Sequence, residues 1–197
     1  MEKDVLVPTT REKMIDSTLD IIKEEGFQKV TVRKIAQRAG VNIASVNYHF
    51  GSKDAVINEA LLQVTKNLMS CFEILKDKDL DAQTRLRKFL QDYTDVIENS
   101  PDIIRCFISQ LINHIDINVA YGEYLKAEGF QLLEATLGDL LPGENGSARK
   151  MLAVQLMCCI GYPTLMGSFL TDVTDFDYSS REQRYKYLEV LINRILT

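Results

Sequence analysis

The stretch from Gly26 to Lys53 constrains the fold of this chain more than any other part of it. Two short helical patterns, over about residues 32–39 and 43–49, flank Gly40, which can adopt the positive φ of a tight turn at little cost. The stretch has no Asp or Glu, and its five basic residues are Lys29, Arg33, Lys34, Arg38 and Lys53. Two helices joined by such a turn, with a basic surface, predict a helix-turn-helix that binds duplex DNA.

The net charge of −5 is unfavourable for DNA binding only when it is averaged over the whole chain. Residues 1–60 carry nine basic and nine acidic residues, so the excess of acid lies entirely beyond residue 60. Within residues 1–60 the acids lie before Gly26 or after Lys53, and salt screens charges beyond about 8–10 Å. A phosphate backbone that approaches residues 26–53 would therefore meet a basic surface.

The rest of the chain shows helical periodicity and no strand alternation, internal repeat or low-complexity tract. A first helix is expected to begin after Thr9 or Thr10 and to end near Glu25. We expect Pro163 to kink one of the later helices. Those later helices are expected over about residues 53–76, 81–98, 101–115, 119–140, 147–170 and 181–196. The prediction is an all-α protein, with a three-helix head at residues 1–52 and a body of about six helices at residues 53–197.

No part of the sequence favours an enzyme or a membrane protein. It shows no nucleophile–base motif, no Gly-rich phosphate loop and, with His49 and His114 as the two histidines, no zinc-ligand spacing. We therefore expect no cofactor and no metal site. No apolar run approaches the roughly 20 residues that span a bilayer, and the first residues do not resemble a signal peptide. These observations favour a cytoplasmic protein.

The four cysteines, Cys71, Cys106, Cys158 and Cys159, all lie within apolar helical patterns. Buried free thiols are the simplest interpretation. A thiol or redox sensor that uses the vicinal pair Cys158–Cys159 is the alternative, and it requires exposed thiols of low pKa.

Residues 26–61 resemble the TetR (tetracycline-repressor) family of bacterial transcription regulators. The resemblance rests on Gly26-Phe27, Thr31-Val32, Ile35-Ala36, Ala39-Gly40-Val41 and the run from Val46 to Val56, which contains Tyr48-His49-Phe50-Gly51-Ser52-Lys53-Asp54. It implies a three-helix DNA-binding head, a six-helix regulatory body and a homodimer. It also implies that phosphates contact Thr31, Tyr48 and Lys53, and that the groove face includes Asn42, Ile43, Ser45, Asn47 and His49.

Two residues depart from the family pattern. Ala44 stands where many members carry glycine, and Asn47 stands where many carry an aromatic residue. The change at Asn47 bears either on the choice of base or on the fit in the groove.

The chemistry of these side chains supports the same assignment. Lys53 and Tyr48 can bind phosphate oxygens, which positions a protein on DNA without reading its sequence. Asn47 can form two hydrogen bonds with adenine, Ser45 can reach several base edges, and the methyl group of Ala44 can contact thymine. Two roles stay open for His49, phosphate contact or packing beside Phe50. The predicted DNA-contact set is Thr31, Arg33, Asn42, Ile43, Ala44, Ser45, Asn47, Tyr48, His49 and Lys53.

Two further sets of residues are predicted in the body. A cleft for a small apolar or aromatic effector would be lined by Met69, Phe72, Phe89, Tyr93, Cys106, Phe107, Gln110, His114, Tyr121, Tyr124, Met157 and Cys158. The last two helices would form a four-helix dimer interface through Leu152, Leu156, Cys159, Pro163, Met166, Phe169, Tyr185, Leu188, Leu191, Ile192 and Ile195. For each residue in both sets, the competing interpretation is plain core packing.

The functional prediction is a ligand-responsive transcriptional regulator that acts as a repressor. A homodimer would bind a pseudo-palindromic DNA operator, and a small-molecule effector would release or alter that binding. The alternatives are a transcriptional activator, the thiol-responsive regulator described above, and a helical interaction module that does not bind DNA.

Overall fold

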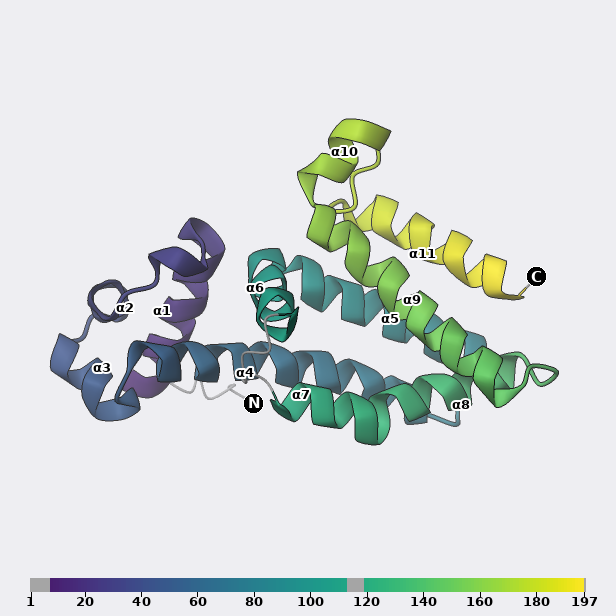
Figure 1. Ribbon diagram of the computed structural model, residues 1–197, viewed down its shortest axis with the longest axis horizontal. Helices are drawn as coiled ribbons and strands as arrows, with labels where there is room; N and C mark the ends of the chain where they lie inside the picture. Colours follow the sequence, from purple (N-terminus) through teal and green to yellow (C-terminus); the bar gives the residue numbers. More distant parts are fainter. Residues whose placement is uncertain (1–7, 113–118, 197) are drawn as a thin grey trace, which may run out of the picture. The chain divides into compact units, whose positions relative to one another are not determined.

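The computed structural model describes residues 8–112 and 119–196, and every regular element in these ranges is helical (Figure 1). The predicted all-α class is confirmed. The described residues fall into two compact units. One contains residues 8–64 and 102–112, and the other contains residues 65–101 and 119–196. The proposed functional division between residues 52 and 53 stays a prediction.

The first unit contains the predicted helix-turn-helix. Its elements are α1 (Thr10–Glu25), the 3₁₀ turn η1 (Phe27–Lys29), α2 (Val32–Ala39), α3 (Ile43–Phe50), the first part of α4 (Lys53–Cys71) and most of α6 (Pro101–Ile112). Met14, Ile22, Ile35 and Val46 are at most 1% exposed and form the centre of the head. Burying each such side chain contributes about 1.5–3 kcal/mol.

Side-chain caps set where the three head helices begin. Thr9, rather than Thr10, is the N-cap of α1, and it exchanges hydrogen bonds with Glu12 in a capping box. Thr31 accepts a hydrogen bond from the backbone N–H of Lys34, which confirms it as the cap of α2. Asn42 is likewise confirmed as the cap of α3.

The turn between α2 and α3 depends on a glycine in the left-handed region. Gly40 has φ 70° and ψ 32°, which a residue with a side chain adopts only at a cost. The N–H of Val41 donates to the carbonyl of Ala36 at 2.9 Å, so the turn closes α2 and directs the chain into α3.

The second unit continues α4 and adds the remaining helices. They are the 3₁₀ turn η2 (Phe72–Lys76), α5 (Ala82–Glu98), α7 (Val119–Tyr124), the π-helical turn η3 (Leu125–Gly129), α8 (Phe130–Leu140), α9 (Gly146–Met166), α10 (Ser168–Thr174) and α11 (Arg181–Leu196). Phe72, Phe89, Leu133, Leu156 and Leu188 are at most 1% exposed and lie at the centre of this core.

Two of the expected helices change geometry along their length. The helix expected over 53–76 ends as α-helix at Cys71 and tightens into η2. The helix expected over 119–140 contains the π turn η3, which ends at Gly129. A Cβ atom at Gly129 would lie only 3.0 Å from Leu125 Cδ2 and 3.3 Å from a ring carbon of Phe72, so the wide turn follows close packing at this glycine.

The prediction of one helix over residues 147–170 is wrong for its last four residues. The helix passes through Pro163 and ends at Met166, and the chain then turns at Gly167 (φ 54°) into α10 across a bend of 92°. Pro163 has no N–H for the carbonyl of Cys159, and the hydroxyl of Tyr187 donates to that carbonyl at 2.9 Å instead. The aromatic side chain therefore compensates for the proline inside α9.

Ion pairs involving buried arginines join helices that are distant in sequence. Arg184 of α11 is 4% exposed and donates to Asp95 of α5 at 2.7 Å, and Tyr185 donates to the same carboxylate at 2.9 Å. Arg85 of α5 is 3% exposed and binds Asp139 of α8 at 2.6 Å. These pairs orient α8 and α11 on α5.

Within the described ranges no single helix is both long and apolar enough to cross a membrane. The α9–α10 pair meets the length and composition criterion only when both helices are taken together across their bend.

Candidate nucleic-acid interface

The outer face of α3 is a surface of exposed side chains with diverse chemistry. Ile43, Ala44, Asn47 and Tyr48 are all exposed, and their spacing places them on one side of the helix. Ile43 is 48% exposed and Tyr48 is 87% exposed, both unusually high for apolar or aromatic residues. By contrast, Val46 is 1% exposed and anchors α3 in the head. An eight-residue helix presented in this way suits the width of a major groove.

Two residues of the predicted groove face already take part in the cap of α3. The Asn42 side-chain oxygen accepts from the Ser45 N–H at 2.7 Å and from the Ser45 hydroxyl at 3.0 Å. The Asn42 amide nitrogen and the Ser45 oxygen lone pairs keep hydrogen-bonding capacity. Asn47 is exposed and is the amide side chain within the helix itself.

His49 lies between two aromatic rings at the end of α3. It contacts Tyr48 edge-on, with ring centroids 5.3 Å apart, and Phe50 at 6.4 Å. The ring is nevertheless exposed, so both roles predicted for His49 stay open.

The predicted phosphate contacts lie at helix starts. Thr31 is the N-cap of α2, Arg33 follows within its first turn, and Lys53 is the first residue of α4. All three side chains are exposed. Backbone N–H groups and the helix dipole make such positions favourable for an anion. Among the described residues, Arg33 and Lys53 form no ion pair with a carboxylate.

The basic surface is smaller than the residue count suggests. Lys34 is ion-paired with Glu25, and Arg38 binds Glu24 at 2.5 Å. The hydrogen bond from Lys34 lowers the pKa of Glu25, and the hydrogen bond to Glu24 raises the pKa of Arg38. Sequence reasoning missed these pairs because both acids precede Gly26, although an acid-rich end of α1 was visible. The charge open to phosphate thus comes from Lys29, Arg33 and Lys53.

The described candidates for an effector cleft form an aromatic cluster in the second unit. Phe72 contacts Phe89 at 4.7 Å, Tyr124 at 5.6 Å and Tyr93 at 5.9 Å between ring centroids. The hydroxyls of Tyr93 and Tyr121 lie 2.6 Å apart, and burial raises the pKa of Tyr93 to about 12. The tyrosines are therefore neutral hydrogen-bonding groups in apolar surroundings.

The remaining candidates for the effector cleft are not part of this ring cluster, although one of them, Met69, contacts it. Met69 offers its backbone carbonyl to Tyr124 at 3.4 Å, Met157 is half-buried, and Cys158 is exposed. The side chains of Cys106, Phe107, Gln110 and His114 lie outside the described residues.

The predicted dimer residues fall into two groups. Leu156, Leu188 and Ile192 are at most 1% exposed, and Pro163 is also buried, so these four are core residues of the protomer with no further surface to lose. Phe169 is 56% exposed. The remaining six are half-buried: Leu152, Cys159, Met166, Tyr185, Leu191 and Ile195.

Six apolar side chains on α9, α10 and α11 are exposed, and sequence reasoning included only Phe169 among its dimer residues. They are Met151, Val154, Tyr162, Phe169, Val173 and Val190, each more than half exposed. The spacing of Met151, Val154 and Cys158 along α9 is the helical period that could have identified this side. We refer to these six residues as the apolar face.

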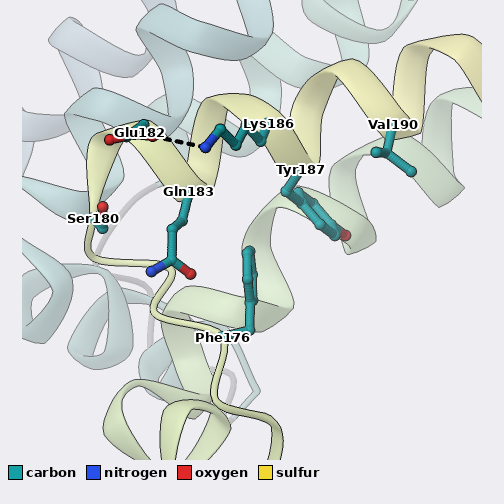
Figure 2. A pocket seen from close by; sticks show the side chains of 7 residues that line it. All are labelled: Phe176, Ser180, Glu182, Gln183, Lys186, Tyr187 and Val190. Atoms are coloured by element: carbon teal, nitrogen blue, oxygen red, sulfur yellow. Dashed lines mark hydrogen bonds and ion pairs between the residues drawn. The ribbon is translucent and has the colours of Figure 1, made fainter.

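Two hollows are lined by residues of α11, the helix that carries Val190 of the apolar face. A groove of about 640 Å³ lies along α11, where the rings of Phe176 and Tyr187 lie beside Gln183 and Val190 (Figure 2). A second hollow of about 620 Å³ is lined by five predicted dimer residues, Leu152, Leu156, Cys159, Leu191 and Ile195, together with neighbouring side chains.

The described cysteines differ in their surroundings. Burial raises the pKa of the Cys71 thiol to about 12, so this thiol is unreactive at neutral pH. Cys158 is exposed and Cys159 is half-buried, and both are free thiols.

Comparison with known proteins supports the assignment of α2 and α3 as a DNA-binding helix-turn-helix. The sequence profile described as "Bacterial regulatory proteins, tetR family" matches residues 14–60, which include all of α2 and α3. The chain is 25% identical over 147 residues to the HTH-type transcriptional repressor KstR2 of Rhodococcus jostii, covering 74% of this chain and 71% of that protein. It is 37% identical over 68 residues to the regulator BetI of Stenotrophomonas maltophilia, covering 34% of this chain and 35% of that protein.

Solved structures share the fold along nearly the whole chain. A transcriptional regulator from Pseudomonas aeruginosa PAO1 superimposes with a TM-score of 0.71 at 25% identity, covering 94% of this chain and 89% of that one. The regulator PfmR of Thermus thermophilus gives 0.70 at 16% identity, covering 91% and 97%. The latter similarity shows the fold alone. The proteins matched by sequence are transcription regulators rather than enzymes.

Proposed function

We propose that this chain is a repressor of the TetR family of bacterial regulatory proteins, whose homodimer binds a two-fold DNA operator and responds to a small effector. The observation that carries the proposal is the outer face of α3, where Asn47 and Tyr48 are exposed and Lys53 follows across a two-residue junction. This arrangement joins a base-reading amide to phosphate-binding groups.

A single head reads too few base pairs to specify a site by itself. A recognition helix contacts one half-site, and dimeric helix-turn-helix proteins obtain specificity by placing two such helices one helical turn apart. The apolar face supplies the surface for a second copy, because exposed apolar patches rimmed by polar groups mark association sites. We propose that α9 and α11 of two protomers pack together, with Met151, Val154 and Val190 losing their exposure.

The effector is proposed to bind beside the aromatic cluster of Phe72, Phe89, Tyr93 and Tyr124. Such a site suits a mostly apolar or aromatic molecule that accepts a hydrogen bond from a neutral phenol. The helix α4 runs without interruption from Lys53 to Cys71, directly before Phe72, so we propose that a change at the cluster reaches the junction with α3 along this helix. An effector shifts operator binding only through its different affinities for the two states of the protein.

The proposal is tested by two single substitutions in the head. Lys53→Ala should weaken binding to every DNA sequence and flatten the salt dependence by about one unit, since it removes one phosphate contact. Asn47→Ala should change the sequence preference by about 1–3 kcal/mol at one base position, with little change in salt dependence. Fluorescence anisotropy with footprinted genomic fragments and matched random fragments measures both effects.

Four outcomes, from DNA binding, effector binding and footprinting, separate the competing functions. Equal losses on all sequences for Asn47→Ala would remove its base-reading role. No retention of any DNA at low salt would favour the helical interaction module. If every apolar or aromatic compound that binds the protein leaves operator affinity unchanged, the effector mechanism is wrong. The position of the footprint relative to the promoter distinguishes a repressor from an activator, and both act on DNA in the cytoplasm.

A further inference from the structure

Arg11, in the first turn of α1, contacts α3 and α4 at the same time. Its Nη2 atom lies 2.7 Å from Oε2 of Glu59 on α4. Its Cζ atom lies over the ring of Phe50, 5.1 Å from the ring centre, and Phe50 is the last residue of α3. The guanidinium therefore holds one residue on each side of the junction between the recognition helix and α4.

That junction is short and has little intrinsic stiffness. It consists of Gly51 and Ser52, and Gly51 has φ 76° and ψ −37°, where a glycine meets little steric resistance. The N–H of Gly51 closes α3 on the carbonyl of Asn47 at 2.8 Å, and the Ser52 hydroxyl caps α4 through the N–H of Ala55 at 3.1 Å. Because both helices are closed at their ends, the angle between them depends on the dihedral angles of the junction.

The Arg11 contacts are too exposed to act mainly through stability. The side chains of Arg11 and Glu59 are 45% and 37% exposed, and ion pairs and cation–π contacts at such positions contribute little to folding. Their geometric effect is larger, because the guanidinium is planar and can stack on a ring while its edge binds a carboxylate. The capping box between Thr9 and Glu12 fixes the turn that carries Arg11.

We propose that Arg11 is a positioning residue for DNA recognition, bracing the α3–α4 junction so that the recognition helix keeps one angle to α4. This inference rests on the proposed DNA-binding function. Base contacts demand a defined helix orientation, whereas phosphate contacts from flexible side chains tolerate a change of angle. Loss of the brace therefore reduces binding to the operator more than binding to random DNA.

The experiment compares two DNA fragments of equal length, the footprinted operator and a random sequence, by fluorescence anisotropy at several salt concentrations. Arg11→Met should lower the ratio of operator affinity to random-DNA affinity roughly tenfold. Lys13→Met is the matched control, since it removes one positive charge from the same helix at an exposed position, and it should leave the ratio unchanged. Arg11→Lys should give an intermediate ratio, because lysine keeps the charge and loses the stacking.

A second pair of variants tests whether the contacts act together. Phe50→Leu should lower the ratio as Arg11→Met does. The double variant, Arg11→Met with Phe50→Leu, should lower it little further than either single change, because both changes remove the same contact. Glu59→Gln keeps the side-chain shape and should also lower the ratio, so the inference stays testable if thermal unfolding shows that Arg11→Met does not fold.

Equal losses on both DNA fragments for Arg11→Met, or the same drop in ratio for Lys13→Met, would overturn the positioning role. A wild-type protein that binds neither fragment at low salt would instead overturn the proposed DNA-binding function. The two failures are therefore distinct.

Discussion

Glu24 and Glu25, at the end of α1, neutralise two of the cations that point outward from α2. Lys34 is paired with Glu25, and Arg38 with Glu24, in the protein without DNA. A phosphate can engage these cations only by displacing the carboxylates or by sharing the cations with them. At the scale of single residues, these pairs hold α2 against α1 and moderate the attraction of the head for any DNA.

The double substitution Glu24→Gln with Glu25→Gln should increase affinity for random DNA, because it frees two cations for phosphate. The slope of log affinity against log salt should steepen by up to about two units. A salt titration of anisotropy measures this slope. Glu123→Gln with Glu134→Gln is the matched control, since it changes the net charge equally on the body. A wild-type slope in the Glu24/Glu25 variant would show that the pairs do not compete with phosphate.

At the scale of elements, tertiary contacts rather than local sequence decide where helices change geometry. The π turn η3 lies where Gly129 packs against Phe72 and Tyr124. Gly122, one helix earlier, is exposed and has open space where a Cβ would be. The two glycines thus have the same intrinsic helix propensity and opposite surroundings.

Gly129→Ala should destabilise the protein by about 1–2 kcal/mol, since overpacking costs more than the helix propensity of alanine returns. Gly122→Ala should stabilise it by up to about 1 kcal/mol. Urea unfolding followed by circular dichroism measures both changes. If Gly129→Ala is as stabilising as Gly122→Ala, then close packing does not account for the π turn.

The ion network on α5 makes a prediction about pH. Partial burial opposes ionisation of Asp95, but hydrogen bonds from Arg184 and Tyr185 outweigh it and hold the pKa of this carboxyl below its ordinary value. A depressed pKa means that the pair stabilises the fold above the unfolded pKa of about 3.9, and that this contribution is lost as pH falls through the folded value.

Asp95→Asn should therefore lower the free energy of unfolding at pH 7 by about 2–3 kcal/mol, because Arg184 stays buried without its counter-charge. The variant should also lose less stability than wild type between about pH 5 and pH 2, where native carboxylates such as Asp95 become protonated. Asp92→Asn on the same helix is the control. Burial and the nearby Asp95 raise the pKa of Asp92, so neutralising it should be harmless. Equal acid sensitivity of Asp95→Asn and wild type would contradict this account.

The boundaries of some helices could be predicted from the sequence, and those of others could not. Thr31, Gly40 and Asn42 act through their own backbone, so the limits of α2 and α3 could be predicted from local chemistry. The end of α9 at Met166 was not predicted, because the expected helix ran through Gly167, which adopts φ 54° and turns the chain into α10. The hydrogen bond that lets α9 pass through Pro163 comes from Tyr187, 28 residues from the Cys159 carbonyl that it binds.

The same distinction holds for the candidate site. Exposure of Asn47 and Tyr48 followed from helical phase alone, whereas the Arg11 brace and the pairing of Arg38 with Glu24 depend on how α1 crosses the other helices. On the body, periodicity identified apolar helices but could not decide which apolar side faces inward. Leu156 proved to be core, and Met151 proved to be exposed.

At the scale of the whole molecule, the proposed function requires two heads on one DNA duplex. The distribution of charge supports this arrangement, since the basic residues open to phosphate lie between residues 29 and 53 and the excess acid lies beyond residue 60. An acidic body disfavours DNA contact away from the head, and the apolar face provides the surface through which two copies can associate.

The most direct test is the stoichiometry of the complex with a footprinted operator, measured by sedimentation velocity with labelled DNA. We predict two chains on each operator, with an affinity that falls steeply as salt rises, and loss of the two-chain complex when Met151 and Val154 are both replaced by Asp. A single chain bound with full affinity and sequence preference, or no DNA bound at low salt, would contradict the account.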